Sequence, residues 1–345
     1  MHSRFTRALV GVVGAAVMAA WSAPLVAQDA DPAPKRAEGE GPFDKLIIRG
    51  ATLIDGQGGP PRGPVDIVIE KNRITQVAEV GYPGLPINEA RRPKGPAREI
   101  DAKGMYVMPG LIDLHVHTCG KPKAPDAEYC YKLWLSHGIT TVRGVPLGGF
   151  EWSASEAKRS STNEITAPRL VNYQRPGSGK GWTGGQITTP EKAREWVRWA
   201  KTQGIDGLKV GAHEPEIMAA LMDEAKKLGL GSTAHLQQTG VPNMNAMQAV
   251  RLGLGAVTHY YGIFESMYEG TSIQPYPADY NYSDEQWRFG QVARQWSLVK
   301  PKSAKWYAFL DTLKKYDATL DPTMTTYMSG RNLMYRRTAE WHEKY

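Results

Sequence analysis

The feature that most constrains the fold is a long series of short apolar runs that alternate with helical stretches from residue 109 onward. The apolar runs include residues 111–117, 139–145 and 207–211, and amphipathic segments such as 214–229 separate them. Strands that alternate with helices form parallel sheets through right-handed crossovers. This many units in series predict an α/β fold of the (β/α)8 TIM-barrel type.

The apolar runs of the barrel number seven rather than eight. The chain ends at Tyr345 before an eighth strand can be recognised. We therefore expect residues 109–345 to form an incomplete barrel that lacks strand eight, as in a truncated copy or a gene fragment. Residues 260–304 are an aromatic-rich insertion after the sixth run. It forms either a lid or substrate wall over the barrel mouth, or a satellite helical layer with its own core.

The residues before the barrel fall into three segments. Residues 43–108 alternate apolar and polar residues in short runs between Gly/Pro turns, which predicts a small β-sandwich. Residues 28–42 have no apolar period and are expected to be a flexible tether. Residues 1–27 place Arg4 and Arg7 before a short apolar run and a small-residue cleavage site, the pattern of a signal peptide. Because the run is too short for a membrane helix, we expect a periplasmic or secreted protein with no stable membrane span.

Composition excludes some functions and leaves others open. The net charge of +7 is spread along the chain without a basic cluster, so no nucleic-acid partner is expected. Two cysteines cannot build a disulfide framework or a four-sulfur zinc site. In an oxidising compartment Cys119 and Cys130 could form one disulfide, which the sequence alone does not decide. The oligomeric state also stays open.

A His-x-His pair marks the end of the first barrel strand. Side chains alternate along a strand, so His115 and His117 face the same way. Both are expected to point into the barrel at the end where barrel active sites are built. Two neutral imidazoles at this spacing suit a metal ion, although two polar residues at a barrel rim would have the same pattern.

Three further residues occupy equivalent positions on later strands. Lys209, His235 and His259 are separated by 26 and 24 residues, close to the length of one βα unit. We therefore expect them to converge on the same mouth. A lysine within a buried strand is costly unless it is neutralised or paired. Burial lowers its pKa and makes the amine nucleophilic, so carbon dioxide can convert it to a bridging carbamate. A salt-bridged or snorkelling lysine is the alternative.

The ordered segments MPGLIDLHVH and GITTVRG, followed by Lys209, His235 and His259, resemble the amidohydrolase superfamily. The closer likeness is to its branch of imidazolonepropionase-related enzymes and metal-dependent Xaa-Pro dipeptidases. The resemblance covers nearly the whole chain after residue 45 and implies a barrel with a small β-sandwich built from both chain ends. It implies that His115 and His117 bind the more buried of two divalent ions. It also implies that carboxylated Lys209 bridges them and that His235 and His259 bind the second, with zinc as the expected metal.

The resemblance further implies hydrolysis of an amide or peptide C–N bond in a small molecule or dipeptide by a metal-bound hydroxide. The family's proton-carrying aspartate follows strand eight, and no such segment precedes Tyr345. The catalytic acid–base residue is therefore unassigned, and Asp321 on the seventh strand is a poor substitute. Three functions stay open: an exported binuclear amidohydrolase, a mononuclear cyclic-amide hydrolase or deaminase, and an inactive truncated metal-binding relic.

Three more residues are weaker candidates for substrate binding. Arg143, at the end of the second strand, can meet a substrate carboxylate or an internal acid. His213 lies in the loop after Lys209 and can touch substrate or simply be solvated. Tyr260 directly follows His259 at the start of the aromatic insertion.

Overall fold

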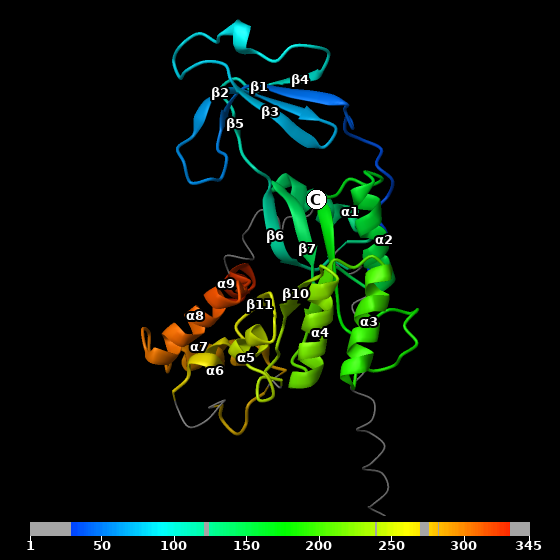
Figure 1. The fold of residues 1–345 in the computed structure, drawn as a ribbon, viewed down its shortest axis with the longest axis vertical. Helices are drawn as coiled ribbons and strands as arrows, with labels where there is room; N and C mark the ends of the chain where they lie inside the picture. Colours follow the sequence, from blue (N-terminus) through cyan, green and yellow to red (C-terminus); the bar gives the residue numbers. More distant parts are fainter. Residues whose placement is uncertain (1–28, 121–123, 239, 270–275, 282, 332–345) are drawn as a thin grey trace, which may run out of the picture.

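The computed structural model describes residues 29–120, 124–238, 240–269, 276–281 and 283–331. The predicted signal peptide, residues 1–27, lies outside the described residues. A five-stranded sheet occupies one end of the molecule, and a larger parallel sheet flanked by helices occupies the rest (Figure 1). In the described part of the chain, no helix is long and apolar enough to cross a membrane.

The N-terminal sheet has the strand order β3-β2-β1-β4, with β5 also pairing with β1. β1, β2 and β3 are antiparallel, whereas β4 and β5 run parallel to β1. Their alternating apolar residues bury Ala51, Val65 and Ile67 on one face. The strands are β1 (Lys45–Leu53), β2 (Arg62–Glu70), β3 (Arg73–Glu79), β4 (Arg98–Asp101) and β5 (Tyr106–Val107).

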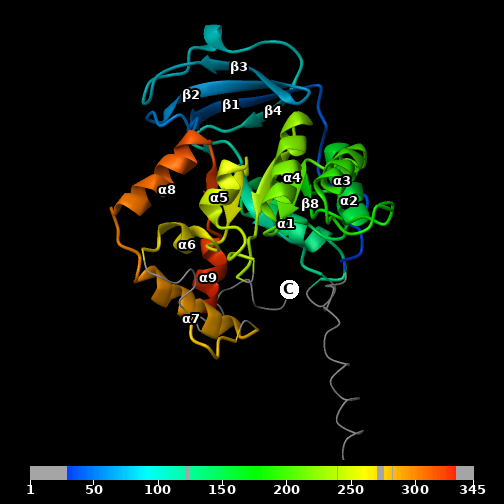
Figure 2. The same cartoon turned by 60° about the horizontal axis from the view of Figure 1, so that its bottom comes forward.

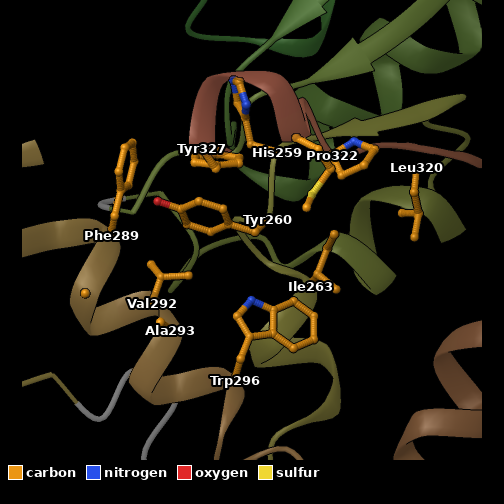
Figure 3. Close-up of a pocket in the computed structure, with 12 residues that line it drawn as sticks. His259, Tyr260, Ile263, Phe289, Val292, Ala293, Trp296, Leu320, Pro322 and Tyr327 are labelled. Atoms are coloured by element: carbon orange, nitrogen blue, oxygen red, sulfur yellow. The ribbon is translucent and has the colours of Figure 1, made fainter. Parts of the chain in front are cut away.

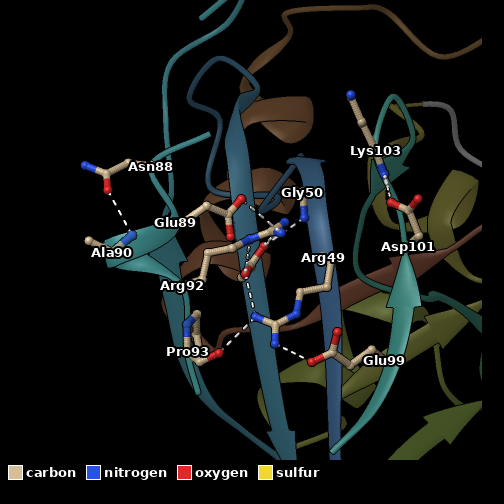
Figure 4. A network of polar contacts seen from close by, with 11 residues as sticks. Arg49, Gly50, Asn88, Glu89, Ala90, Arg92, Pro93, Glu99, Asp101 and Lys103 are labelled. Carbon is tan, nitrogen blue, oxygen red and sulfur yellow. Dashed lines mark hydrogen bonds and ion pairs between the residues drawn. The ribbon is translucent and has the colours of Figure 1, made fainter. Parts of the chain in front are cut away.

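A buried carboxylate ties this sheet together (Figure 4). The Asp66 side chain is fully buried, and Arg49 donates to its Oδ2 atom at 2.7 Å. Arg92 donates to the same oxygen at 3.2 Å, and the Gly50 N–H donates to Oδ1 at 2.8 Å. Arg49 also pairs with Glu99 on β4. The network therefore links β1, β2 and β4 with the turn that carries Arg92, and it compensates the buried charge.

The larger sheet has seven parallel strands in the order β12-β11-β10-β9-β8-β7-β6, a nearly closed barrel of the TIM type. This confirms the seven strands expected from the sequence. Within the described residues, no strand ladder joins β12 to β6. The strands are β6 (Leu111–Val116), β7 (Ile139–Gly144), β8 (Arg169–Gln174), β9 (Gly207–Val210), β10 (Gly231–Ala234), β11 (Ala256–Thr258) and β12 (Thr319–Asp321).

Helices cover the outside of this sheet, with α1 to α4 on one side and α5 to α9 on the other (Figures 1 and 2). Trp196 and Met218 are fully buried on α3 and α4, in the same core as Leu208 of β9. The helices are α1 (Glu128–Ser136), α2 (Phe150–Ser161), α3 (Pro190–Thr202), α4 (Pro215–Lys227), α5 (Ala246–Arg251), α6 (Ile263–Met267), α7 (Glu285–Trp296), α8 (Ala304–Lys315) and α9 (Met324–Arg331), and η1 (Glu89–Arg91) is a 3-10 turn.

Residues 29–42 differ from the flexible tether expected there. Ala30 and Ala33 are buried in the core that also contains Tyr131 of α1. The Asp31 N–H donates to Pro125 O at 2.9 Å, and the Ala33 N–H donates to Glu156 Oε2 at 3.2 Å. The small alanine side chains fit against the helices, so this segment packs along the barrel although its sequence has no apolar period.

The two cysteines form a disulfide between the loop after β6 and helix α1. The Cα atoms of Cys119 and Cys130 lie 6.1 Å apart, within the usual range for a disulfide. The bond therefore anchors the loop that follows His117.

Candidate active site

The five predicted ligands all lie at or near the carboxyl ends of their strands. His115 is the penultimate residue of β6, and His117 follows that strand directly. Lys209 lies within the four-residue strand β9. His235 and His259 directly follow β10 and β11. The carboxyl ends of barrel strands are where this fold builds its sites, so the topology delivers all five residues to one mouth.

The structure brings the four histidine rings into one cluster. The His115 ring centroid lies 5.3 Å from that of His117 and 4.8 Å from that of His259. The His235 and His259 centroids are 4.6 Å apart. The ring of Tyr261 stacks on His235 at 4.9 Å with an interplanar angle of 10°. The cluster is therefore continuous from the first barrel strand to the sixth.

Hydrogen bonds fix the orientation of two of these rings. His117 Nδ1 lies 2.7 Å from Pro146 O, and a carbonyl can only accept, so Nδ1 donates its proton. His259 Nδ1 lies 2.6 Å from Thr323 Oγ1. Both rings therefore keep Nε2 available for another partner. Imidazoles that bind metals are commonly oriented in this way through their second nitrogen.

The backbone of His259 is itself strained. Its φ of 64° lies in the left-handed region, which is uncommon for a residue with a side chain. The His259 N–H donates to Asp321 O at 2.9 Å on the neighbouring strand. Together with the Thr323 contact, this hydrogen bond holds the ring at the barrel mouth. Backbone strain of this kind is concentrated at functional sites.

Lys209 is a buried amine in this cluster. The residue is only 5% exposed, and burial lowers its pKa to about 7. The charge of Asp321 works in the opposite direction, and the charge of Arg143 lowers the pKa further. A substantial fraction of this amine is therefore neutral and nucleophilic near neutral pH.

The histidines are also kept neutral by their surroundings. Burial lowers the pKa of His235 to about 3 and that of His259 to about 2, and neighbouring positive groups add to the effect. Burial likewise lowers the pKa of His117 to about 4, although part of this residue reaches solvent at the open side of the barrel. The pKa of His115 is lowered mainly by burial, whereas its interaction with Asp321 raises it. Neutral imidazole is the form that binds metals.

The types of these side chains suit a metal site, but the distances between the side chains do not yet match one. Among the described residues, Lys209 Nζ and His235 Nε2 are buried atoms without a hydrogen-bond partner, which is costly unless a ligand completes them. In the same part of the chain, no three His, Cys, Asp or Glu side chains lie close enough together to hold a metal ion. β6, which carries His115 and precedes His117, is an edge strand of the open sheet. The donors are thus present and neutral, but they are not drawn together at ligand distances.

Asp321, judged a poor catalytic candidate from the sequence, is brought into the site. Its Oδ2 atom accepts a hydrogen bond from Arg143 at 3.1 Å and lies 3.5 Å from His115 Nδ1. Burial raises its pKa, but interactions with His115, followed by Arg143 and Lys209, lower it overall. Arg143 therefore meets an internal acid, one of the two roles expected for it.

Of the weaker substrate-binding candidates, Tyr260 lies beside the histidine cluster and His213 lies outside it. His213 is half-buried in the loop between β9 and α4, where burial lowers its pKa. Within the described residues, the ring contacts of the histidine cluster do not include His213. Tyr260 lies beside the cluster, and its ring centroid is 5.2 Å from that of Tyr327.

Sequence reasoning missed Tyr261 and Thr323, which touch the rings of His235 and His259. Tyr261 belongs to the YYG run next to Tyr260, and Thr323 lies two residues after Asp321. The available signal is their position just after a strand end, where side chains reach the mouth. That signal does not say which of several adjacent polar residues makes the contact.

A pocket adjoins the cluster at His259 (Figure 3). Its volume is about 710 Å³, and its walls come from α6, α7, α9 and the strand ends of β11 and β12. Phe289, Val292 and Trp296 of α7 face Tyr260 across it. The described part of the aromatic insertion therefore lines a pocket beside the mouth.

The chain was compared with known proteins, and the sequence matches are to hydrolases. No family model matches the chain. Over 113 residues, the chain is 38% identical to the N-acyl-D-aspartate deacylase of Alcaligenes xylosoxydans xylosoxydans, a match that covers 32% of this chain and 18% of the relative. Over 227 residues, it is 27% identical to the dihydroorotase of Anaeromyxobacter dehalogenans (strain 2CP-C), a match that covers 62% of this chain and 48% of the relative. The chain is therefore similar in sequence to enzymes of the amidohydrolase superfamily.

A solved structure is similar to the chain at the level of the fold. The crystal structure of a Xaa-Pro dipeptidase with bound methionine in the active site matches with a TM-score of 0.55 and 17% identity, over 84% of this chain and 70% of that chain. The matched proteins named here, a deacylase, a dihydroorotase and a dipeptidase, are hydrolases of carbon–nitrogen bonds. The chain spans less than half the length of the two curated relatives named above.

Proposed function

We propose that the protein is an exported metal-dependent amidohydrolase that cleaves an amide or peptide C–N bond in a small substrate. The observation that carries the proposal is the gathering of four neutral histidines and one buried lysine at the carboxyl ends of barrel strands. Packing alone does not account for the buried Lys209 Nζ and His235 Nε2 atoms, which lack partners among the described residues.

Two pairs of histidines would each bind one divalent ion, with zinc as the expected metal. His115 and His117 would hold one ion, and His235 and His259 the other. The bonds from His117 to Pro146 O and from His259 to Thr323 fix which ring nitrogen is presented. A divalent ion bound here would supply Lewis acidity and lower the pKa of water. The imidazoles need not lose a proton before binding, because burial already keeps them neutral.

Lys209 would supply the anion between the two ions. Its neutral amine adds to carbon dioxide, which forms the N–C bond of a carbamate and releases one proton. The depressed pKa of about 7 makes this reaction accessible near neutral pH. The resulting carbamate would carry two oxygens able to accept hydrogen bonds or bind cations, whereas the buried Nζ atom has no hydrogen-bond partner among the described residues. Carboxylation would thus replace a buried amine, which is unfavourable without a hydrogen-bond partner, by an anion that could bind both ions.

The test is hydrolysis by zinc-loaded protein in bicarbonate buffer, with a panel of dipeptides and N-acyl amino acids. His115→Ala and Lys209→Ala should each lose nearly all turnover. Short carboxylic acids should partly restore the Lys209→Ala variant, because they replace the bridging anion. Lys158→Ala, on the solvent side of α2, is the matched control and should keep wild-type turnover. Wild-type turnover in the Lys209→Ala variant would contradict the binuclear proposal.

A mononuclear cyclic-amide hydrolase or deaminase is the second candidate. It would use the clustered histidines for one ion and would not depend on carboxylation of Lys209. A single ion needs fewer donors and no bridging anion. This candidate predicts that the protein binds one ion per chain and that Lys209→Ala leaves the metal content unchanged. It also predicts turnover of cyclic amides or aminopurines rather than dipeptides.

Export is proposed from the N-terminal sequence pattern of residues 1–27. The disulfide between Cys119 and Cys130 supports it, because such bonds persist in oxidising compartments. In a bacterial expression host, the protein recovered from the periplasm should begin at Gln28, as determined by N-terminal sequencing. Recovery of unprocessed protein in the cytoplasm would contradict export.

A further inference from the structure

The described residues that line the pocket beside His259 include no carboxylate, ammonium or guanidinium group. Twelve residues line it, and none of them is Asp, Glu, Lys or Arg. Ile263, Phe289, Val292 and Trp296 contribute apolar surface from α6 and α7 (Figure 3). The polar side chains of the lining are those of His259, Tyr260 and Tyr327. A charged ligand group would lose its hydration here without meeting a charged side chain among the lining residues.

The pocket is continuous with the proposed reaction site. His259 belongs both to its wall and to the histidine cluster, where its ring centroid lies 4.6 Å from that of His235. Pro322 and Met324 line the pocket just after β12, and Tyr260 lines it shortly after β11. These positions are at the carboxyl ends of the strands, where barrel enzymes hold their substrates. A group seated in the pocket would therefore stay within a few bonds of the cluster.

The size of the pocket indicates how much of a ligand it can take. Its volume of about 710 Å³ is within the usual range for small-molecule sites. Tyr327 of α9 closes one side through ring contacts with Tyr260 at 5.2 Å and with Phe289 at 5.0 Å. Aromatic rings in such edge-on and tilted arrangements accept a further ring well.

We propose that this pocket binds an uncharged arylalkyl or long alkyl group attached to the scissile amide, so that the substrates are amides with a large apolar substituent. The inference rests on the proposed amide hydrolysis and adds the substrate class to it. Each methylene of the substituent that enters the pocket should raise kcat/KM roughly three- to fourfold until the pocket is full. Substrates whose substituent ends in a carboxylate or an ammonium group should be poor.

The test separates binding from hydrolysis. The probe is 4-phenylbutan-1-ol, which is uncharged and has no bond to hydrolyse, and its binding is measured by calorimetry on the full chain with and without zinc. Ala293→Trp fills the pocket from α7, whereas Arg294→Trp places the same side chain at an exposed neighbouring position outside it. Gly290→Leu is a second filling variant, because a Cβ there meets open space and leucine favours helix.

Wild-type protein and Arg294→Trp should bind the probe with equal affinity, and both filling variants should bind it at least tenfold more weakly. Binding that is absent from wild-type protein, or unchanged in both filling variants, would overturn the inference. Hydrolysis is then measured for N-acetyl-, N-butyryl- and N-(4-phenylbutyryl)-glycine. Turnover that shows no preference for the phenylbutyryl group overturns the pocket assignment but leaves amide hydrolysis standing. Probe binding without cleavage of any amide supports the pocket and contradicts the proposed function.

Discussion

Burial keeps the imidazoles of His235 and His259 unprotonated, with pKa values of about 3 and about 2. In the unfolded chain, both groups would titrate near pH ~6.5. The unfolded state therefore binds more protons at any pH between these limits, so the free energy of unfolding of the metal-free protein falls as the pH falls below about 6.5. Each histidine can contribute up to about 1.4 kcal/mol per pH unit.

Urea denaturation of the metal-free protein at pH 7, 6 and 5 measures this residue-scale prediction. Wild-type protein should lose stability steadily over this range, and His235→Asn should show a smaller loss because one titrating group is removed. His137→Asn changes an exposed histidine at the end of α1 and is the control, with an expected slope close to that of wild-type protein. Equal slopes in His235→Asn and wild-type protein would show that His235 is not held neutral by the fold.

At the scale of elements, Arg143 on β7 contacts the two edge strands of the larger sheet. From β7 it donates through Nε to Leu114 O on β6 at 2.7 Å and through Nη2 to Asp321 Oδ2 on β12 at 3.1 Å. Its guanidinium also lies 5.3 Å from the ring centroid of Tyr173 on β8. Through these two hydrogen bonds, Arg143 links both edge strands of the open sheet, β6 and β12.

Arg143→Met should lower the free energy of unfolding by about 3 kcal/mol, the low end for breaking a buried ion pair, because the Asp321 carboxylate loses its cation. Both side chains are close to 10% exposed, so solvent screens the pair only slightly. Arg62→Met, which breaks the exposed Arg62–Glu79 pair, should cost less than about 1 kcal/mol in the same urea titration. The double variant Arg143→Met/Asp321→Leu should recover part of the loss. A cost for Arg143→Met no larger than that for Arg62→Met would mean that the Arg143–Asp321 pair does not stabilise the fold.

Across the whole molecule, the sequence predicts those features that depend on short repeating patterns along the chain. The two-residue period of a strand and the length of a βα unit are enough to place His115, Lys209 and His259 at one mouth. The Arg143–Asp321 contact spans 178 residues and depends on how far the sheet curls, which no local period encodes. The packing of Ala30 and Ala33 was missed because small side chains give almost no hydropathy signal.

The central claim is that the histidines and Lys209 together hold divalent ions. It is tested most directly by counting zinc ions per chain after equilibrium dialysis in bicarbonate buffer. Wild-type protein should retain two ions, and Lys209→Ala should retain one at most, because it has no bridging anion. His213→Ala, which alters a histidine outside the ring cluster, should retain two. Loss of all zinc from wild-type protein, or two ions retained in the Lys209→Ala variant, would contradict the account.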